Sequence, residues 1–409
     1  MRRTTPPSRI LLHLLLVLAA AGALVAVPAQ PSWASMSVDK TWDLGRGITL
    51  QRWSDPAGPI HAFVLTFKPN SSPATLDVGM PSSQLPGEAV TSAIGASHHA
   101  VAAINGDFGH GRPLHATAVD GVLWQTGVQH GANFSLAANE DRAFIGNGHP
   151  HVTAGTPTGP LPVAHWNSGP PTGDEIAGYS PKGGSLENPP RNACSVRLKP
   201  KGGRFWTSER RGVGQNYVVD ASRCARTAMP EHGLTVLSID RSAARHPKRA
   251  LSRLGPGDRV TIRWSMGWPG VLDTIGGRPV IVQHGQNVAP STCQSFLCGK
   301  NPRTGVGFDS HGNVMLVVVD GRIPSWSIGM YLDQFGAFFA HELNATAAMN
   351  LDGGGSATMW VKKTGPWCSG KPTGVTDGCV VNDANVETGY KQRPVENALL
   401  VLPGPDPGE

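Results

Sequence analysis

The amino-acid sequence lacks several familiar patterns, and each absence excludes a class of protein. Its 51 glycines follow no Gly-X-Y period, which excludes a collagen-like chain. No two cysteines are spaced C-x-x-C, which argues against a zinc knuckle. No basic run with interleaved aromatic residues occurs, so we expect no nucleic-acid partner. No internal repeat with a period of about 20 to 50 residues is present either.

Several known enzyme motifs are present only in part, because a required residue is missing. Residues 354–358 (GGSAT) lack the last glycine of a nucleophile elbow and the lysine of a P-loop. Residues 341–345 (HELNA) begin like a zinc-protease helix, but Ala345 stands where the second histidine is needed. Four histidines between residues 98 and 115 fit no standard metal spacing. We therefore expect neither a metal nor a cofactor.

Glycine and proline are abundant, at 51 and 35 of 409 residues. Both are costly inside helices, so the chain should be rich in turns and strands and poor in long helices. The 39% of hydrophobic residues and the 11 tryptophans exclude a wholly disordered chain. Apolar alternation and runs predict strands over residues 60–67 and 314–319, and a helical spacing predicts a helix over 330–345. We predict an α+β fold with a mixed β-sheet core flanked by a few helices and an inserted β-rich segment.

The N-terminus has the three regions of a secretory signal peptide. Residues 1–9 carry three arginines and no acid, residues 10–27 are almost wholly apolar, and a small-residue cleavage site follows at Ala29 or Ala34. The alternative is a membrane anchor, since an apolar run of this length is borderline for spanning a bilayer. We expect a cleaved signal, a secreted protein and no stable membrane insertion after its removal. Loss of the three arginines lowers the formal charge from +6 to about +3, which calls for no acidic partner.

Six cysteines fit export into an oxidising compartment. Six thiols allow 15 connectivities, so the sequence alone does not fix the pairing. The shortest loops favour three sequential pairs, which we expect to be structural. These pairs are Cys194–Cys224, Cys293–Cys298 and Cys368–Cys379.

Two segments share one physical form, a buried strand that runs into a glycine cluster with a carboxylate. Residues 104–109 read INGDFG, and residues 350–356 read NLDGGGS. Glycines after an acid let the backbone approach a ligand and turn several N–H groups toward one anionic oxygen. The alternative is a tight strand connection with a surface aspartate. The spacing alone leaves both interpretations open.

Five segments, in this order, resemble the phosphodiester glycosidase family. They are residues 102–108 (AAINGDF), 276–279 (GGRP), 303–307 (RTGVG) continuing to 319–322 (VDGR), 350–358 (NLDGGGSAT) and 393–399 (RPVENAL). The resemblance covers roughly residues 60–402. Two positions depart from the family pattern, because Gly109 replaces an aromatic residue and Gly305 replaces alanine. Both changes remove side-chain atoms and are expected to open space.

The resemblance implies hydrolysis at the anomeric carbon of a sugar joined through phosphate, with release of free sugar. A carboxylate pair serves such a reaction as acid, base or nucleophile. The expected catalytic residues are Asp107 and Asp352, with Asp320 as a third candidate for which a turn role is the alternative. Arg303 is expected to bind the phosphate as a bidentate fork and to share one cleft with both aspartates, unless it forms a structural ion pair. The expected substrate-binding residues are Asn105, Gly106, Arg303, Gly353, Gly354, Gly355, Ser356, Thr358 and Asn397.

The domain plan follows from the signal, the resemblance and the composition. It comprises a signal peptide at 1–29, a tether at 30–55, a phosphodiester glycosidase-like domain at 56–403 with a β-rich insertion at 184–266, and a Pro/Gly tail at 404–409. The expected partner is a carbohydrate or sugar phosphate. Two other functions stay open. One is a glycosidase or lyase on a phosphate-free cell-surface polysaccharide, and the other is a non-catalytic sugar- or wall-binding protein of the same fold.

Overall fold

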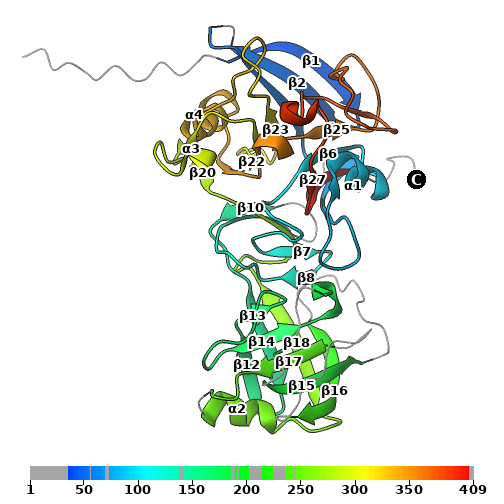
Figure 1. Ribbon diagram of the computed structural model, residues 1–409, viewed down its shortest axis with the longest axis vertical. Helices are drawn as coiled ribbons and strands as arrows, with labels where there is room; N and C mark the ends of the chain where they lie inside the picture. The colour runs from blue at the N-terminus through cyan, green and yellow to red at the C-terminus, as the bar shows by residue number, and fades with distance from the viewer. Residues whose placement is uncertain are drawn as a thin grey trace, which may run out of the picture. The chain divides into compact units, whose positions relative to one another are not determined.

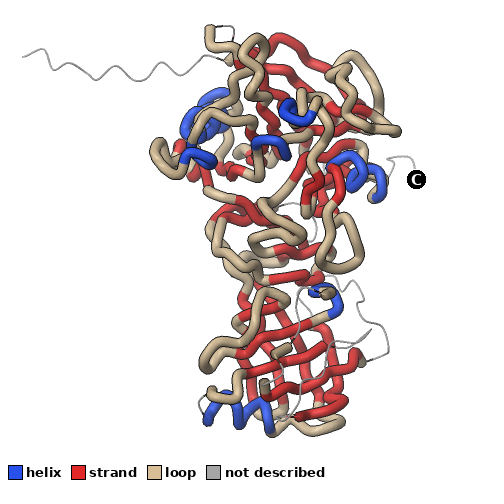
Figure 2. Tube along the Cα trace, viewed as in Figure 1, coloured by secondary structure: helices blue, strands red, loops and turns tan. Residues whose placement is uncertain are grey.

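Strands dominate the described part of the chain, with 44% strand and 11% helix (Figure 2). The computed structural model describes residues 36–55, 57–69, 73–137, 142–185, 189–190, 193–201, 214–223, 235–243 and 245–404. The predicted α+β fold with a mixed core sheet is therefore wrong, because this is a mostly β protein built from antiparallel sheets. Parallel strands need long crossovers, usually helical, and nearly all of the described strand pairs are antiparallel.

The central sheet has eight strands, in the order β1-β2-β3-β23-β22-β24-β20-β21, and every pair is antiparallel. Its strands are β1 (Ser37–Gly45), β2 (Ile48–Asp55), β3 (Ile60–Phe67), β23 (Val314–Val319), β22 (Arg303–Phe308), β24 (Ala347–Asn350), β20 (Val280–Gln283) and β21 (Gln286–Asn287). The strands predicted over 60–67 and 314–319 are thus confirmed.

Strand β23 shows why this sheet is covered on both faces. All six of its residues are buried. Val314, Leu316 and Val318 belong to one hydrophobic cluster, whereas Met315, Val317 and Val319 belong to another. Successive side chains of a strand point to opposite faces, so an unbroken apolar run marks a strand with packing on each side.

The second sheet has five antiparallel strands, in the order β26-β25-β6-β28-β4, and its apolar residues share one cluster with the central sheet. Its strands are β26 (Cys379–Val380), β25 (Met359–Val361), β6 (Ala102–Asn105), β28 (Ala398–Pro403) and β4 (Ala74–Gly79). Helix α1 (Thr91–Ser97) packs on this sheet through Ile94. A short pair joins β5 (Ala89–Val90) to β27 (Pro394–Val395).

A third, five-stranded sheet follows the order β10-β9-β19-β7-β8. Its strands are β10 (Ala143–Gly146), β9 (Ala132–Ala137), β19 (Val271–Gly277), β7 (Thr117–Val119) and β8 (Val122–Gln125). Phe134 and Ile275 from its two longest strands are fully buried in the cluster shared by the first two sheets. This sheet therefore contributes to the same core, and its strand β19 delivers the glycine-rich segment 276–279 to it.

A separate eight-stranded sheet curls into a near-closed barrel, drawn in green in Figure 1. Its order is β12-β11-β18-β16-β15-β17-β14-β13, and β12 lies near β14. Its strands are β12 (Gly159–Val163), β11 (His151–Thr156), β18 (Arg259–Ser265), β16 (Gln215–Arg223), β15 (Cys194–Pro200), β17 (Thr235–Ile239), β14 (Ile176–Tyr179) and β13 (His165–Trp166). Only β13 and β14 pair in parallel among the described strands. The barrel has its own core, which includes Trp166 and Tyr217.

The described helices are short, and two of them reach seven residues, namely α1 and α2 (Arg245–Ser252). The helix predicted over 330–345 is present as α4 (Leu332–Ala337) followed by a π-helical turn, Phe338–Glu342. Its Phe335 and Phe339 cover one face of the central sheet. No helix in the described ranges is long and apolar enough to cross a membrane.

Two of the three expected disulfides are confirmed. Cys293 pairs with Cys298 across helix α3 (Ser295–Cys298), and Cys368 pairs with Cys379, with Cα–Cα distances of 5.5 and 5.6 Å. The third expected pair, Cys194–Cys224, involves a residue outside the described ranges. The confirmed pairs are consistent with an oxidising compartment.

Candidate active site

The two glycine-rich segments come together at the ends of β6 and β24. The Asp352 N–H donates to the Gly106 carbonyl at 3.0 Å, and Asn105 Nδ2 donates to the Asp352 carbonyl at 2.7 Å. These residues are about 250 positions apart in the chain and belong to different sheets. The convergence of the two aspartate-bearing turns follows from this direct backbone contact.

Asn105 joins three segments and is itself fully buried. Its Oδ1 accepts hydrogen bonds from Thr304 Oγ1 at 2.7 Å and from the Thr358 N–H at 3.0 Å. All of its observed partners are protein groups. Asn105 was expected to bind substrate; its hydrogen bonds place it where it orients the Asp352 turn.

Asp107 is enclosed by protein and is 0% exposed. One carboxylate oxygen lies 2.6 Å from His115 Nδ1, and the other accepts the His115 N–H at 2.8 Å. The Asp107 N–H donates to Asn397 Oδ1 at 2.8 Å. A Cβ on Gly276 would overlap the His115 side chain, so only glycine lets the histidine pack here. The spacing of the four histidines between residues 98 and 115 does not distinguish His115 from the other three.

Asp352 is partly exposed, unlike Asp107. Burial raises the pKa of its carboxyl group, and the Asp107 charge adds to that rise. Hydrogen bonds from the Ser356 side chain and the Gly353 N–H, together with the Arg393 charge, act in the opposite direction. Arg393 Nη1 lies 3.4 Å from Ser356 Oγ. A reachable carboxylate with an arginine beside it is thus positioned at the end of β24.

Glu396 is a third carboxylate at this centre, and the sequence did not single it out. It is 5% exposed. Burial raises its pKa to about 8, and the charges of Glu88, Asp352 and Asp107 add to the rise. A Cβ on Gly109 would overlap the Glu396 side chain. The glycine at 109 therefore makes room for the glutamate rather than leaving open space.

The glycine turn itself forms a short 3-10 helix, Gly354–Ser356. The Gly354 N–H donates to the Pro302 carbonyl at 2.9 Å, and the Ser356 N–H donates to the Gly353 carbonyl at 3.1 Å. These two N–H groups are occupied by backbone partners, so they do not form the expected anion cradle. A Cβ on Gly355 would meet the Arg393 guanidinium, so this glycine permits the arginine to approach.

Two side chains predicted to bind substrate carry buried polar atoms that have no hydrogen-bond partner among the described residues. They are Thr358 Oγ1 and Asn397 Nδ2. A buried polar group without a partner is costly, and such groups often mark a functional site. Both lie next to residues already described, since Thr358 binds Asn105 through its N–H and Asn397 binds Asp107.

Arg278 offers a second cation near the aspartates. Its guanidinium lies 5.0 Å from the Phe108 ring and 5.9 Å from the Phe296 ring, and Nη1 donates to Gln129 Oε1 at 3.0 Å. Its backbone pairs with Asn350 at 2.9 Å, which fixes it beside the end of β24. Residues 276–279 are one of the five segments that resemble the family, but no role was predicted for Arg278 within them.

Arg303 turns away from this centre. Its Nε donates to the Met330 carbonyl at 3.0 Å and Nη1 to the Leu297 carbonyl at 2.6 Å, while Nη2 donates to Gly299. Burial lowers its pKa to about 10. The Arg303 guanidinium holds the backbone of the 297–299 loop. It therefore does not face a cleft shared with Asp107 and Asp352, as was expected. The expected ion pair with one of the candidate acids is not among its contacts either.

Asp320 is buried in a different network. Its Oδ2 accepts from Trp326 Nε1 at 2.8 Å, and its Oδ1 accepts from the Asp383 N–H at 2.8 Å and from Asn382 Nδ2 at 3.2 Å. Burial raises its pKa to about 7. Asn382 also donates to the Ala357 carbonyl at 3.0 Å, so the two networks are neighbours. The carboxylate of Asp320 nevertheless faces Trp326 and Asp383, not the other two aspartates.

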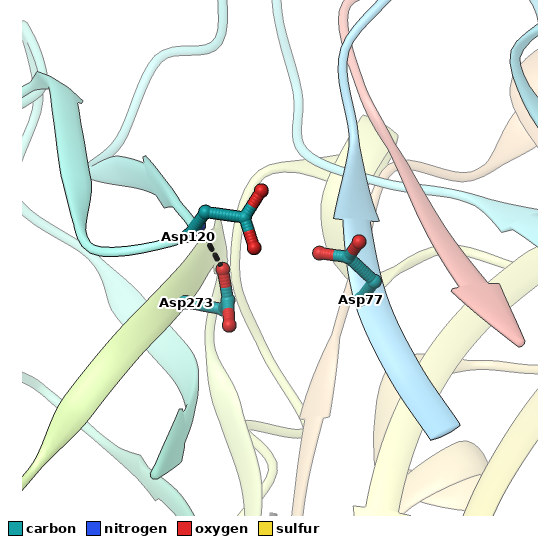
Figure 3. A group of neighbouring side chains, drawn as sticks. All are labelled: Asp77, Asp120 and Asp273. Carbon is teal, nitrogen blue, oxygen red and sulfur yellow. Dashed lines mark hydrogen bonds between the residues drawn. The ribbon is translucent and has the colours of Figure 1, made fainter. Parts of the chain in front are cut away.

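Three further carboxylates, Asp77, Asp120 and Asp273, approach one another from β4, the β7–β8 turn and β19 (Figure 3). One oxygen from each lies within 4.8 Å of the others, and the Asp120 N–H donates to Asp273 Oδ1 at 2.6 Å. Burial raises the pKa of Asp77 to about 6, and the Asp120 charge adds to the rise. Clusters of acidic side chains are common without a bound ion. The raised pKa of Asp77 in this cluster has a consequence for the stability of the folded protein.

Replacement of Asp77 by asparagine is expected to stabilise the protein at pH 8 and to change little at pH 3.5. The folded-state pKa of about 6 lies above the ordinary aspartate value of 3.8. The stability contributed by this group is therefore present below pH 3.8 and lost as the pH rises through 6. Asparagine does not titrate and escapes this loss, which we expect to be on the order of 2 kcal/mol. Urea unfolding at both pH values, with EDTA present to remove any cation, measures it, and a less stable variant at pH 8 would contradict it.

A comparison with family models finds one match, in the C-terminal half of the chain. Residues 211–402 match the model described as phosphodiester glycosidase. This part of the chain is thus similar to the phosphodiester glycosidase family, and it contains four of the five segments that carried the resemblance. No curated protein matches the chain by sequence.

Two solved structures share the fold at low sequence identity, and a third is similar at a lower TM-score. A protein from Synechocystis is 19% identical with a TM-score of 0.64, over 88% of this chain and 63% of its own. An exported protein from Burkholderia pseudomallei K96243, as its name describes it, is 23% identical with a TM-score of 0.57, over 85% of this chain and 74% of its own. The zebrafish N-acetylglucosamine-1-phosphodiester alpha-N-acetylglucosaminidase catalytic domain is 14% identical with a TM-score of 0.42, over 90% and 87%. This chain thus spans less than two thirds of the Synechocystis protein.

Proposed function

We propose that this protein hydrolyses the glycosidic bond of a sugar-1-phosphodiester and releases free sugar and a phosphomonoester. The similarity to the phosphodiester glycosidase family supports the class of reaction. The observation that carries the proposal is the pair formed by a partly exposed Asp352 and a buried Glu396 whose pKa of about 8 keeps it mostly protonated at neutral pH. Glycoside hydrolysis requires one accessible carboxylate that can ionise and a second carboxyl group that stays protonated.

In the proposed reaction, the bond between the anomeric carbon and the phosphate oxygen breaks through an oxocarbenium-like state. The bonding electrons leave with the phosphate. Water supplies the hydroxyl group of the free sugar, and its proton passes to a carboxylate. Asp352 acts on the sugar side, either as the base that activates water or as the group that stabilises the cation. Asp107, which is enclosed, positions the Asn397 and His115 segments and does not contact the substrate.

The leaving phosphate is already a good leaving group, so its charge must be bound rather than fully protonated. A protonated Glu396 can donate a hydrogen bond to a phosphate oxygen, whereas an ionised one would repel it. Arg278 and Arg393 take the role first expected of Arg303. Arg278 is already oriented by Phe108 and Phe296, and Arg393 lies against Ser356.

We also propose that the protein acts outside the cytoplasm. The two disulfides suit an oxidising compartment, and the N-terminal sequence has the pattern of a signal peptide. The residues of that pattern lie outside the described ranges. An envelope or extracellular glycan that carries sugar-1-phosphate linkages is therefore the proposed substrate class.

A screen of small sugar-1-phosphodiesters tests the function directly. The purified mature protein is incubated with α-linked glucose, mannose, galactose and N-acetylglucosamine 1-(methyl phosphate) diesters, and the released reducing sugar and methyl phosphate are both measured. At least one diester is expected to yield the two products in equal amounts. Release of sugar only from phosphate-free polysaccharides would contradict the proposal, and so would turnover of none of these substrates.

A further inference from the structure

A cavity of about 460 Å³ lies beside the central sheet, and none of Asp107, Asp352 and Glu396 lines it. Its wall includes four large aromatic residues, Trp42, Trp326, Trp367 and Tyr390. The volume is in the range of small-molecule sites, which combine aromatic walls with a few polar groups. The proposed function assigns nothing to this cavity.

The tryptophan rings are fixed by neighbouring side chains. Trp42 and Trp367 meet edge to face, with ring centroids 6.5 Å apart and an interplanar angle of 70°. Trp326 stacks on His61 at 3.5 Å and 4°. Trp367 lies next to the Cys368–Cys379 disulfide, which holds its loop. Rings held in this way lose little conformational freedom when a ligand binds.

The buried Asp320 acts beneath this cavity as a positioning residue. Its two carboxylate oxygens hold the Trp326 indole and the Asp383 backbone, both at 2.8 Å, and both partners line the cavity. A carboxylate is expensive to bury, and satisfied hydrogen bonds offset that cost. The network therefore fixes the cavity wall, which gives Asp320 a role other than the catalytic one first considered.

The charges of the cavity point to a neutral ligand. Arg52 pairs with Asp39 at 3.0 Å. Lys371 lies 3.7 Å from Asp383 and 4.8 Å from the Tyr390 ring centroid. Both cations that line the cavity thus already face carboxylates, and an anionic ligand would have to displace these partners. Their polar atoms can still share hydrogen bonds with hydroxyl groups.

Tyr390 adds a conformational observation. Its φ of 68° places a bulky residue in the left-handed region, which is a genuine outlier for such a side chain. Strain of this kind persists only where the surroundings impose it, and it concentrates at ligand sites and clamps. Here the strained backbone turns the ring into the cavity wall, next to Lys371.

We propose that this aromatic cavity binds one neutral saccharide unit of a glycan and is a second sugar site, separate from the three carboxylates. Trp42, Trp367 and Tyr390 would offer flat apolar surfaces to the C–H face of a sugar ring, and Asp383 and Lys371 would bond its hydroxyl groups. The site would hold a part of the glycan that is not cleaved. The choice of a glycan as ligand rests on the proposed function, but binding does not require turnover.

Binding of neutral tetrasaccharides tests the cavity. Calorimetry and tryptophan fluorescence are used with chitotetraose, maltotetraose and mannotetraose on the full mature chain carrying Asp352→Asn, so that no ligand is consumed. At least one tetrasaccharide is expected to bind. Trp42→Ala and Tyr390→Gly should each weaken that binding by about tenfold. Glycine suits the left-handed backbone at 390, so this variant removes the ring without adding backbone strain.

Trp268→Ala is the matched control, because this partly exposed tryptophan stacks on Phe144 and does not line the cavity. The proposal is overturned if no tetrasaccharide binds, if Trp42→Ala and Tyr390→Gly bind as tightly as their parent, or if inorganic phosphate displaces the sugar. Sugar binding without hydrolysis of any small phosphodiester by the wild-type protein would defeat only the proposed function. Hydrolysis without tetrasaccharide binding would defeat only the second site.

Discussion

Asp352→Asn is expected to lower kcat/KM on a sugar-1-phosphodiester by about 10³-fold or more. The amide can neither accept a proton from water nor stabilise a developing cation, and contributions of this type are typically about 10² to 10⁴-fold. The side chain keeps its size and its place beside Ser356. Because burial raises the pKa of Asp352, its ionised form is disfavoured in the folded state, and the substitution should not lower the unfolding temperature.

Asp377→Asn is the matched control, since it makes the same chemical change at an exposed residue in the loop between Cys368 and Cys379. Its kcat/KM should equal that of the wild-type protein. Measurement of initial rates and of thermal unfolding for both variants separates chemistry from folding. A folded Asp352→Asn variant with more than about a tenth of the wild-type activity would remove Asp352 from the proposed chemistry.

The alkaline limb of the pH profile is expected to report Glu396. Above its pKa of about 8 the carboxyl group ionises, can no longer donate a hydrogen bond and repels phosphate. The wild-type kcat/KM should therefore fall about tenfold per pH unit above pH 8. Glutamine is a permanent donor that cannot ionise. Glu396→Gln should stay within about tenfold of wild type at pH 7 and lose the alkaline fall, whereas Glu396→Ala should lose about 10²-fold at pH 7.

Rates from pH 5 to pH 10 for the three proteins make this test. Glu175→Gln, at an exposed glutamate of the barrel that bonds Thr172 and His165, should leave the profile unchanged. If Glu396→Gln retains the same alkaline limb as wild type, another group controls it. If Glu396→Gln is as inactive as Glu396→Ala, then Glu396 transfers its proton and does not merely donate a hydrogen bond.

Strand alternation explains why Arg303 does not face the two aspartates as expected. The segment 303–308 does form β22, and it does pass beside the Asp352 turn, since the Leu351 N–H donates to the Thr304 carbonyl at 2.8 Å. Neighbouring residues of a strand face opposite sides. Thr304 therefore meets Asn105, and Arg303 meets the 297–299 loop. The sequence does not say which of two adjacent polar residues faces the site, because the two faces of this strand are equally buried.

Local patterns predicted individual strands well, but not how they pair. The strands over 60–67 and 314–319 were found because apolar runs and turns are local signals. The helix predicted over 330–345 is only a short α-helix followed by a π-helical turn, which is too little to form the helical layer of an α+β fold. In the barrel, β11 pairs with β18 and β14 pairs with β17, and these pairings between strands distant in the chain depend on contacts that no short window of sequence contains.

Glu396 and His115 escaped prediction for a related reason. Each is defined by what surrounds it, namely the other carboxylates for Glu396 and Asp107 for His115. Glu396 lies between β27 and β28, directly before Asn397, within the 393–399 segment that carried the resemblance. That position was the available signal, but nothing local in the sequence shows that the side chain is buried.

Arg303 has a consequence for the entropy of substrate binding. Two of its hydrogen bonds, to the Leu297 and Gly299 carbonyls, together with the Cys293–Cys298 disulfide, hold the loop that presents Phe296 to Arg278. The loop is thus immobilised during folding, and that loss of freedom does not recur when a ligand arrives. Arg303 does not contact the proposed substrate. It nevertheless preorganises Arg278, which is proposed to bind the phosphate of that substrate.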